Sequence, residues 1–512
     1  MTGYLKLLFA IFNVVILAFV YQSDVLAHGF GERYDLPLPL WLYVSGGGIV
    51  VFSSFLAIGF FLQNREIISH YPTKKIVGIL NGSRRIQQGM LGILGLASAG
   101  ILVLVIISGF IGTQIPSENF SPTFVWIIWW TGMAYLSAVF GNFWAFLNPW
   151  YVLFSFFERL YRLVSRGGEI SLKVPYPTQI GCWPAIILYL SFAWFELVYP
   201  ESAIPVRLSQ FILVYSGITL IGMFLFGKEM WSRNGDPFSL CFGLIGKIAP
   251  VEARVSDPQI CKECTAQCQW SDGVCINCST CYFMASPIDR EILFRPFGAG
   301  LLQSEKVSVP TMIFVIVVLS SVSFDGFTST FLWQLVFSGV YGIIPNVTVT
   351  GTIGLVGFSV VFLVVYLFFS ALMSAATSWR LPILAVGTAF IYSLIPIALA
   401  YHLAHYFSYL LIQGQLIFPL ASDPFGFGWN LFNSGDFVIN IAIVNAKFAW
   451  ITALISIISG HVIAIYVAHV IAMRVFTERV QALRSQYPMV VLMVGYTMLS
   501  LWTLAQPLVE FR

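Results

Sequence analysis

Cysteines and histidines are the residues of this sequence best suited to carry chemistry. Six of the eight cysteines fall within one stretch, "CKECTAQCQWSDGVCINCSTC", and these are Cys261, Cys264, Cys268, Cys275, Cys278 and Cys281. Two cysteines separated by two residues let the chain fold back and direct both sulfurs at one ion. The spacing therefore predicts a metal site.

Zinc is the metal that this spacing favours, because four of the six thiolates would complete a tetrahedral structural site. An iron–sulfur cluster is the alternative, although Gln269 follows Cys268 where the bacterial ferredoxin pattern has proline. Cysteines without metal are the third reading. A bound ion would stabilise the fold of a loop that has too little apolar sequence to build its own core.

Four of the six histidines lie in the last third of the chain. His402 and His405 are three residues apart, so they share one face of a helix. His461 and His469 follow on the next apolar segment, about 12 Å apart along a helix axis, too far to bind one ion together. We therefore expect His402, His405 and His461 to form a group, which Asp325 could complete.

Three imidazoles and a carboxylate suit zinc, copper, iron or manganese. A metal-bound water becomes more acidic and supplies an attacking hydroxide at neutral pH, and Asp325 would be a ligand or a general base. Haem, ligated by one histidine from each helix, is a rival occupant. The simpler reading is that these histidines pack helices together and bond to backbone carbonyls.

The elements that carry these residues are membrane-spanning helices. The chain is 58% hydrophobic and only 10% charged, which indicates an all-α polytopic membrane protein in a lipid bilayer. Scattered basic residues give no footprint for nucleic acid. Ten segments are long enough to cross, at 41–62, 90–112, 124–147, 180–198, 209–227, 307–324, 352–374, 382–412, 448–472 and 489–508.

The first 27 residues read as a secretory signal peptide. Lys6 precedes an apolar run, and "VLA" at 25–27 fits a small-residue cleavage motif. Cleavage would leave His28 as the first residue, where its amine and imidazole could chelate a metal ion. An uncleaved anchor helix is the alternative.

Charge placement predicts the orientation. With His28 outside, 21 of the 26 Lys and Arg residues fall in inner loops, as the positive-inside rule requires. Both ends of the mature chain then face the periplasm of a bacterial inner membrane. Segment 228–306 becomes a cytoplasmic cysteine-rich loop between two halves, 28–227 and 307–512, and the reducing cytoplasm argues against disulfides there. Segment 327–347 looks interfacial or re-entrant.

Five segments carry a resemblance to a known group. They are "AHGFGERYDLPLPLWLYV", "GNFWAFLNPW", "SFDGF", "AYHLAHYFSYLLIQGQ" and "GHVIAIYVAHVIAMRVF". With them, nearly the whole chain resembles bacterial polytopic membrane proteins labelled fenitrothion hydrolase. The resemblance implies hydrolysis of an organophosphorus triester at its P–O–aryl bond, and it assigns no catalytic residue.

Three functions are compatible with these features. The first is a membrane-embedded, metal-dependent hydrolase that takes a lipophilic substrate from the bilayer. The second is a copper- or haem-binding redox or metal-handling protein. A redox relay to the cysteines would need a partner centre in the membrane, and a second membrane subunit is a further candidate partner. The third is an ion-coupled transporter that uses Asp325 and the histidines as proton or ion sites.

Overall fold

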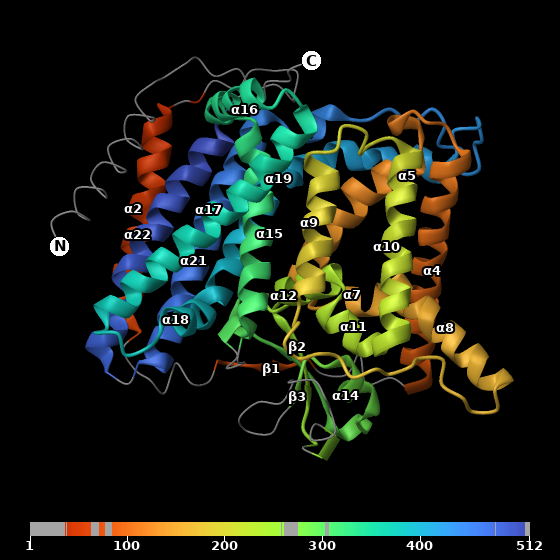
Figure 1. The fold of residues 1–512 in the computed structure, drawn as a ribbon, viewed down its shortest axis with the longest axis horizontal. Coiled ribbons are helices and arrows are strands. Elements are labelled where there is room, and N and C mark those ends of the chain that lie inside the picture. Colours follow the sequence, from red (N-terminus) through yellow and green to blue (C-terminus); the bar gives the residue numbers. More distant parts are fainter. Residues whose placement is uncertain are drawn as a thin grey trace.

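The computed structural model describes residues 36, 38–62, 71–76, 84–257, 259–260, 275–302, 307–476 and 478–506. The signal segment 1–27, His28, Cys261, Cys264 and Cys268 lie outside the described residues, so what the sequence predicts for them stays a prediction. The described chain is a bundle of helices with one small sheet at its lower end (Figure 1). The predicted all-α polytopic class is confirmed.

A helix occupies the place of each predicted span. Among the described residues, nine helical segments are long and apolar enough to cross a membrane, and the fifteen-residue α9 is a shorter apolar helix. The first half contains α2 (Leu40–Phe61), α4 (Arg84–Ile111), α5 (Phe120–Pro122) continued by η2 (Thr123–Thr131) and α6 (Gly132–Phe140), α9 (Trp183–Leu197) and α10 (Pro205–Phe226). The second half contains α15 (Val309–Thr328), α17 (Val347–Ala376), α18 (Ile383–Phe390) continued by η5 (Ile391–Leu394) and α19 (Ile395–Gln413), α21 (Ala446–Val475) and α22 (Arg479–Leu504).

Shorter helices connect or flank these spans. They are η1 (Pro116–Glu118), α7 (Trp144–Leu147), α8 (Pro149–Val164), α11 (Lys228–Asn234), α12 (Pro237–Gly246), α14 (Ser279–Met284), η3 (Pro287–Asp289), η4 (Ala299–Leu302), α16 (Phe331–Ile343), η6 (Gly414–Leu416), α20 (Ile417–Ser422) and η7 (Ile441–Ile443). Helix α16 lies across the upper end of the bundle, and it falls in the segment predicted to be interfacial or re-entrant (Figure 1).

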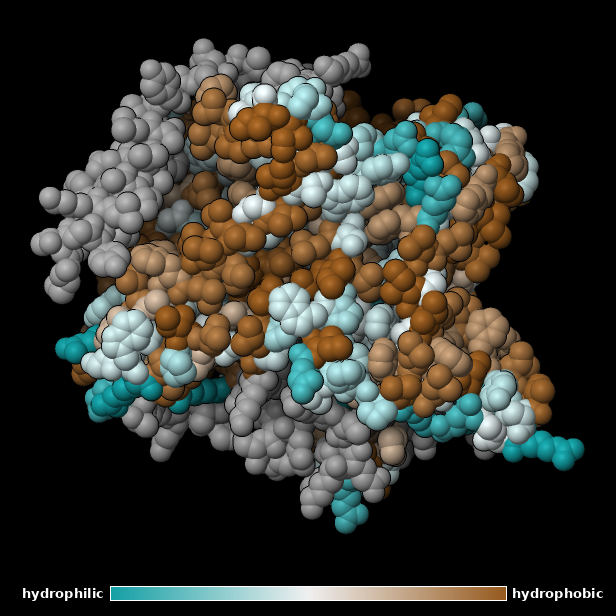
Figure 2. All heavy atoms as spheres, viewed as in Figure 1, coloured by the Kyte–Doolittle hydropathy of each residue, from teal (hydrophilic) through white to brown (hydrophobic). Residues whose placement is uncertain are grey.

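The outer surface has the character of a protein that faces lipid. Most of the visible middle is apolar, and hydrophilic side chains gather toward the upper and lower ends (Figure 2). Ile93 of α4 and Ile221 of α10 are 69% and 60% exposed. Such exposure is stable only where the surrounding solvent is itself apolar, which supports a bilayer environment.

Two of the spans contain irregular turns. The nine-residue segment η2 is a π-helix, and η5 is a 3₁₀ turn that joins α18 to α19. Pro396 lies in the first turn of α19, where its missing N–H breaks the regular hydrogen-bond ladder. In lipid, such breaks persist where neighbouring groups satisfy the freed backbone, and Tyr366 does so by donating its hydroxyl to the Gly387 carbonyl.

Helix α12 enters the bundle although it belongs to the segment predicted to be a cytoplasmic loop. At ten residues it is too short to be recognised as a span by hydropathy. Its Phe238 packs edge-on against Trp129 at 4.7 Å, and Phe242 contacts Trp130. Asp236 begins the helix by accepting the Phe238 N–H, and its other oxygen accepts from Asn148. The helix is thus capped, buried and fixed to the first half.

An antiparallel sheet holds the cysteine-rich segment below the bundle. Its strands are β1 (Lys74–Lys75), β2 (Val251–Val255), β3 (Cys275–Ile276) and β4 (Arg290–Phe294), in the order β1-β4-β2-β3. Arg295 and Glu252 form a fully buried ion pair at 2.8 Å, and Arg295 also bonds to the Lys247 and Ala249 carbonyls after α12. Burial and the Glu252 carboxylate raise the pKa of Tyr71 to about 12, so that its hydroxyl stays a donor to Glu252.

Contacts between loops agree with the predicted alternation of sides. Strands β1 and β4 join the two predicted inner loops 63–89 and 228–306. The ion pair between Arg380 and Glu478 joins two further predicted inner loops, 375–381 and 473–488. At the opposite end, the Thr113 N–H donates to the Phe425 carbonyl between two predicted outer loops.

Candidate functional site

A carboxylate and an imidazole meet between two spans near the upper end of the bundle. Asp325 lies in the last turn of α15, and His405 lies in α19, which packs against α15. The Nε2 atom of His405 is 3.0 Å from Oδ2 of Asp325. Tyr406 donates its hydroxyl to the same oxygen at 2.5 Å. The three residues form what we call the Asp325 cluster.

The Asp325 cluster is half-buried rather than sealed. The side chains of His405 and Asp325 are 22% and 24% exposed. Nε2 of His405 faces the carboxylate. The other ring nitrogen, Nδ1, makes no hydrogen bond to any residue in the described part of the chain. A carboxylate that holds one nitrogen fixes the tautomer and leaves the other nitrogen able to accept a proton. The arrangement can therefore accept and release protons.

Glu196 is a second carboxylate at this site, and the sequence analysis missed it. It lies at the end of α9 in "SFAWFELVYP", is half-buried, and is close enough to Asp325 for the two charges to repel each other. Tyr409 of α19 lies near enough to both carboxylates to interact with them electrostatically. The signal that could have identified Glu196 is an ionisable side chain inside an apolar span, which is costly and usually functional.

His402 lies one turn before His405, and its ring contacts Tyr406 of the Asp325 cluster at 4.8 Å, but it is also enclosed by residues of the η2–α6 span. It is 5% exposed, and its ring meets the edges of Trp130 and Tyr135 at 5.6 and 5.5 Å. Neither ring nitrogen has a hydrogen-bond partner in the described part of the chain. The ring lines a cavity of about 30 Å³, roughly the space of one water molecule.

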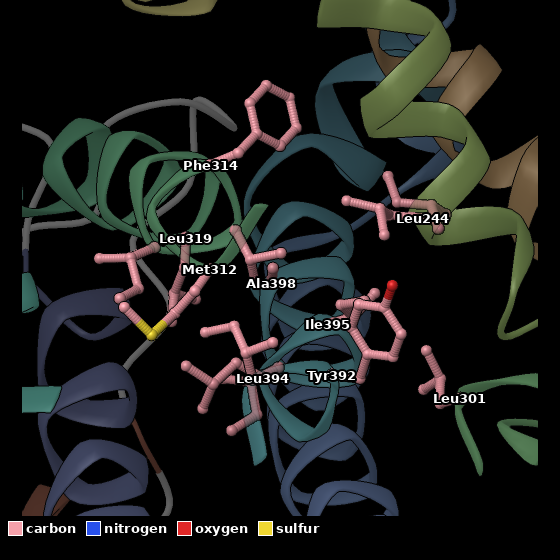
Figure 3. Close-up of a cluster of buried hydrophobic side chains, with 14 of the residues drawn as sticks. Leu244, Leu301, Met312, Phe314, Leu319, Tyr392, Leu394, Ile395 and Ala398 are labelled. Carbon is pink, nitrogen blue, oxygen red and sulfur yellow. The ribbon is translucent and has the colours of Figure 1, made fainter. Parts of the chain in front are cut away.

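The walls of this cavity come from the η2–α6 span and from helices α9, α12, α15 and α19. Leu244 of α12, Phe314 of α15 and Ala398 of α19 are among them, and Figure 3 shows these side chains in the buried cluster between the two halves. Cys241 of α12 also lines the cavity. His402 therefore lies at the junction of the halves, whereas His405 lies near the surface.

His461 is directed away from this pair. It is fully buried in α21, its Nδ1 lies 2.8 Å from the Ile457 carbonyl, and its ring contacts Tyr496 of α22. The neighbouring Gly460 is the residue that faces α19, because a Cβ there would lie 2.3 Å from that of Ala400. Successive helix residues point about 100° apart, so His461 faces α22 instead.

The predicted ligands His402, His405, His461 and Asp325 do not gather around one point. Among the described residues, the cysteines alone supply three or more ligand atoms within 4.8 Å of one another. The structure brings His405 to Asp325, places His402 beside Trp130, and separates His461 from both. His469 has a structural role, because it bonds to Gln486 and to the Leu62 carbonyl.

The cysteine cluster is the clearest place for a metal ion. Cys275, Cys278 and Cys281 have their sulfurs within 4.8 Å of one another. Cys275 lies in β3 opposite Val255, Asn277 turns the chain with a φ of 54°, and Cys278 and Cys281 lie one turn apart at the start of α14. Asparagine tolerates this left-handed conformation. Three thiol groups so arranged could bind a metal ion.

Comparison with known proteins identifies no relative: no family model, no curated protein and no solved structure matches the chain.

Proposed function

We propose that the protein is a membrane-embedded hydrolase in which His405 is the general base and Asp325 orients it. The observation that carries this proposal is the 3.0 Å contact between Nε2 of His405 and the Asp325 carboxylate, in a half-buried site with Nδ1 available. The same pairing of carboxylate and imidazole activates water or a hydroxyl group in many hydrolases.

The reaction follows from these atoms. Nδ1 of His405 takes a proton from water, and the hydroxide oxygen attacks phosphorus in an organophosphorus triester. The P–O–aryl bond breaks, and the aryl oxide leaves with the bonding electrons. Asp325 stabilises the imidazolium that forms. The substrate class comes from the resemblance to proteins labelled fenitrothion hydrolase, and entry from the bilayer suits a lipophilic ester.

In this proposal, His405 activates the water, whereas the sequence suggested activation by a metal ion. The reason is geometric, since a metal with three histidine ligands requires that His461 approach His402 and His405, and its ring faces Tyr496 instead. A carboxylate–histidine pair needs only two neighbouring helices, and α15 and α19 supply them.

Nitrophenol release from fenitrothion by purified protein tests the proposal. We expect His405→Asn and Asp325→Asn to lower the rate by about 10²–10⁴-fold, the usual contribution of a general base. Asp436→Asn is the matched control, because Asp436 is an exposed carboxylate of an outer loop, and it should keep the wild-type rate. Equal rates for all four proteins would refute the assignment.

Ion-coupled transport is a second candidate, and Glu196 favours it. Carboxylates inside a membrane can serve as proton sites, and the irregular turns η2 and η5 are of a kind found in transporters. For this function, proteoliposomes would show proton uptake that Asp325→Asn abolishes, without hydrolysis by the wild type.

For the cysteine cluster we propose structural zinc. Cys275, Cys278 and Cys281 supply three thiolates, and one of Cys261, Cys264 and Cys268 would supply the fourth. Sulfurs around tetrahedral zinc are about 3.8 Å apart, given a Zn–S distance of about 2.3 Å, so the three need only a small movement. An iron–sulfur cluster is the alternative, and the visible spectrum distinguishes the two.

A further inference from the structure

A large apolar cavity lies in the first half of the bundle, on different helices from the Asp325 cluster. Its volume is about 250 Å³. Helices α4, α10 and the η2–α6 span form most of its walls, and Phe192 of α9 and Phe238 of α12 close it toward the second half.

Aromatic side chains dominate the lining of this cavity. Four tryptophans contribute, and they are Trp126, Trp129, Trp144 and Trp150. Large flat rings favour stacked or edge-on contact with another ring. No Asp, Glu, Lys, Arg or His is among the residues that line it, so a charged ligand would lose its hydration without compensation. The walls therefore select a neutral ligand with a flat ring.

One polar group of the lining lacks a partner. Trp150 donates its indole N–H to Ser216 at 2.7 Å, and Trp126 donates to the Ser202 carbonyl. Trp144 is only 2% exposed, yet its N–H has no acceptor anywhere in the described part of the chain. A buried donor without an acceptor is unfavourable. The N–H has almost no accessible area of its own, so it faces packed neighbours and is not a donor into the cavity.

The volume of the cavity and its opening further restrict which ligands can bind. An apolar cavity of about 150 Å³ holds benzene, so 250 Å³ accommodates one substituted ring. Leu94 lines the cavity and is 40% exposed on α4, on a span whose outer side chains face lipid. The ligand would thus enter from the bilayer.

We propose that this cavity binds a neutral, membrane-soluble molecule with a single flat ring. The ring of the ligand packs against Trp129 and Trp150. The site is independent of the proposed hydrolysis, because its lining residues come from other helices than Asp325 and His405.

Tryptophan fluorescence of the purified full-length protein tests the proposal, because four of the fifteen tryptophans line the cavity. A decyl-substituted benzoquinone should quench the emission in a saturable way. Trp129→Leu should raise the dissociation constant about three- to tenfold, as expected for one lost aromatic contact. Ile212→Phe, which fills the cavity from α10, should abolish the saturable component.

Trp183→Phe is the control, because Trp183 is 42% exposed and lies outside the cavity. It should leave the dissociation constant unchanged. Fenitrothion, which is also a neutral single-ring compound, forms a second arm and should compete with the quinone for the site. No competition would contradict selection by ring and charge alone. Quenching by a bromine-labelled phospholipid alone would assign the cavity to an acyl chain and overturn the proposal. Unsaturable quenching, equal in all four proteins, would overturn it as well.

Discussion

At the scale of single residues, the roles of the histidines depend on what each ring faces. His405 meets a carboxylate, His402 meets Trp130 and a small cavity, and His461 bonds to the carbonyl four residues earlier. Sequence spacing correctly indicated that His402 and His405 share a helix. It did not reveal that Asp325 would select His405 alone, because that depends on how α15 packs on α19.

The cysteine cluster supports a prediction at this scale. We expect the purified protein to contain about one zinc ion per chain and to be colourless, and Cys278→Ser to lower the zinc content strongly, because one of three converging sulfurs is lost. Elemental analysis measures the metal. Cys182→Ser is the control, since Cys182 is buried before α9 and outside the cluster. Iron with visible absorption would contradict the zinc assignment.

At the scale of elements, close contact between α19 and α21 fixes which way His461 points. A Cβ at Gly460 would lie 2.3 Å from the Ala400 Cβ and 2.8 Å from the Pro396 carbonyl oxygen. The contact therefore requires glycine. It also determines that the next residue, His461, turns toward Tyr496 of α22.

Gly460→Ala tests this contact. The added methyl group must push the helices apart, and we expect a loss of about 1–3 kcal/mol, typical of overpacking. Thermal unfolding in detergent measures the change. Gly495→Ala in α22 is the matched control, because nothing lies within 4 Å of a Cβ there. Equal stability of the two variants would mean that α19 and α21 are not in close contact at Gly460.

Hydropathy located a helix at each of the ten predicted segments, nine of them long enough to cross a membrane in the described part of the chain, because apolar runs are the strongest signal of a membrane helix. It missed α12, whose ten residues are too few to span, and whose burial depends on Asp236 meeting Tyr215 and Asn148 across the fold. The cysteine spacing predicted the convergence of Cys275, Cys278 and Cys281, because all three ligands are local in sequence. The three histidines do not form one group, because that would require α21 to be rotated so that His461, and not Gly460, faces α19.

At the scale of the whole molecule, the helices share one buried core, and α2 of the predicted first half packs against α21 and α22 of the second. Helix α12 belongs to the central segment, and its Leu244 packs among α15 and α19 residues (Figure 3). The Arg295–Glu252 pair then connects the end of α12 to the sheet that holds the cysteines. A metal ion in the cysteine cluster would therefore stabilise the position of α12 as well.

The orientation of the molecule can be tested by cysteine labelling in whole cells. We expect Ser434→Cys, in the predicted outer loop, to react with a membrane-impermeant maleimide. Glu169→Cys, in a predicted inner loop, should react only after the membrane is permeabilised, because basic loops stay inside. The unsubstituted protein gives the background from native cysteines. The opposite labelling pattern would reverse the predicted orientation.

The central claim is that Asp325 and His405 act as a pair without His461. Fenitrothion hydrolysis by His405→Gln and His461→Gln, measured on equal amounts of folded protein, tests it most directly. The dyad predicts a rate at least about 10²-fold below wild type for His405→Gln and a rate near wild type for His461→Gln. Equal loss in both variants, with metal lost from both, would contradict the dyad and restore a shared metal site.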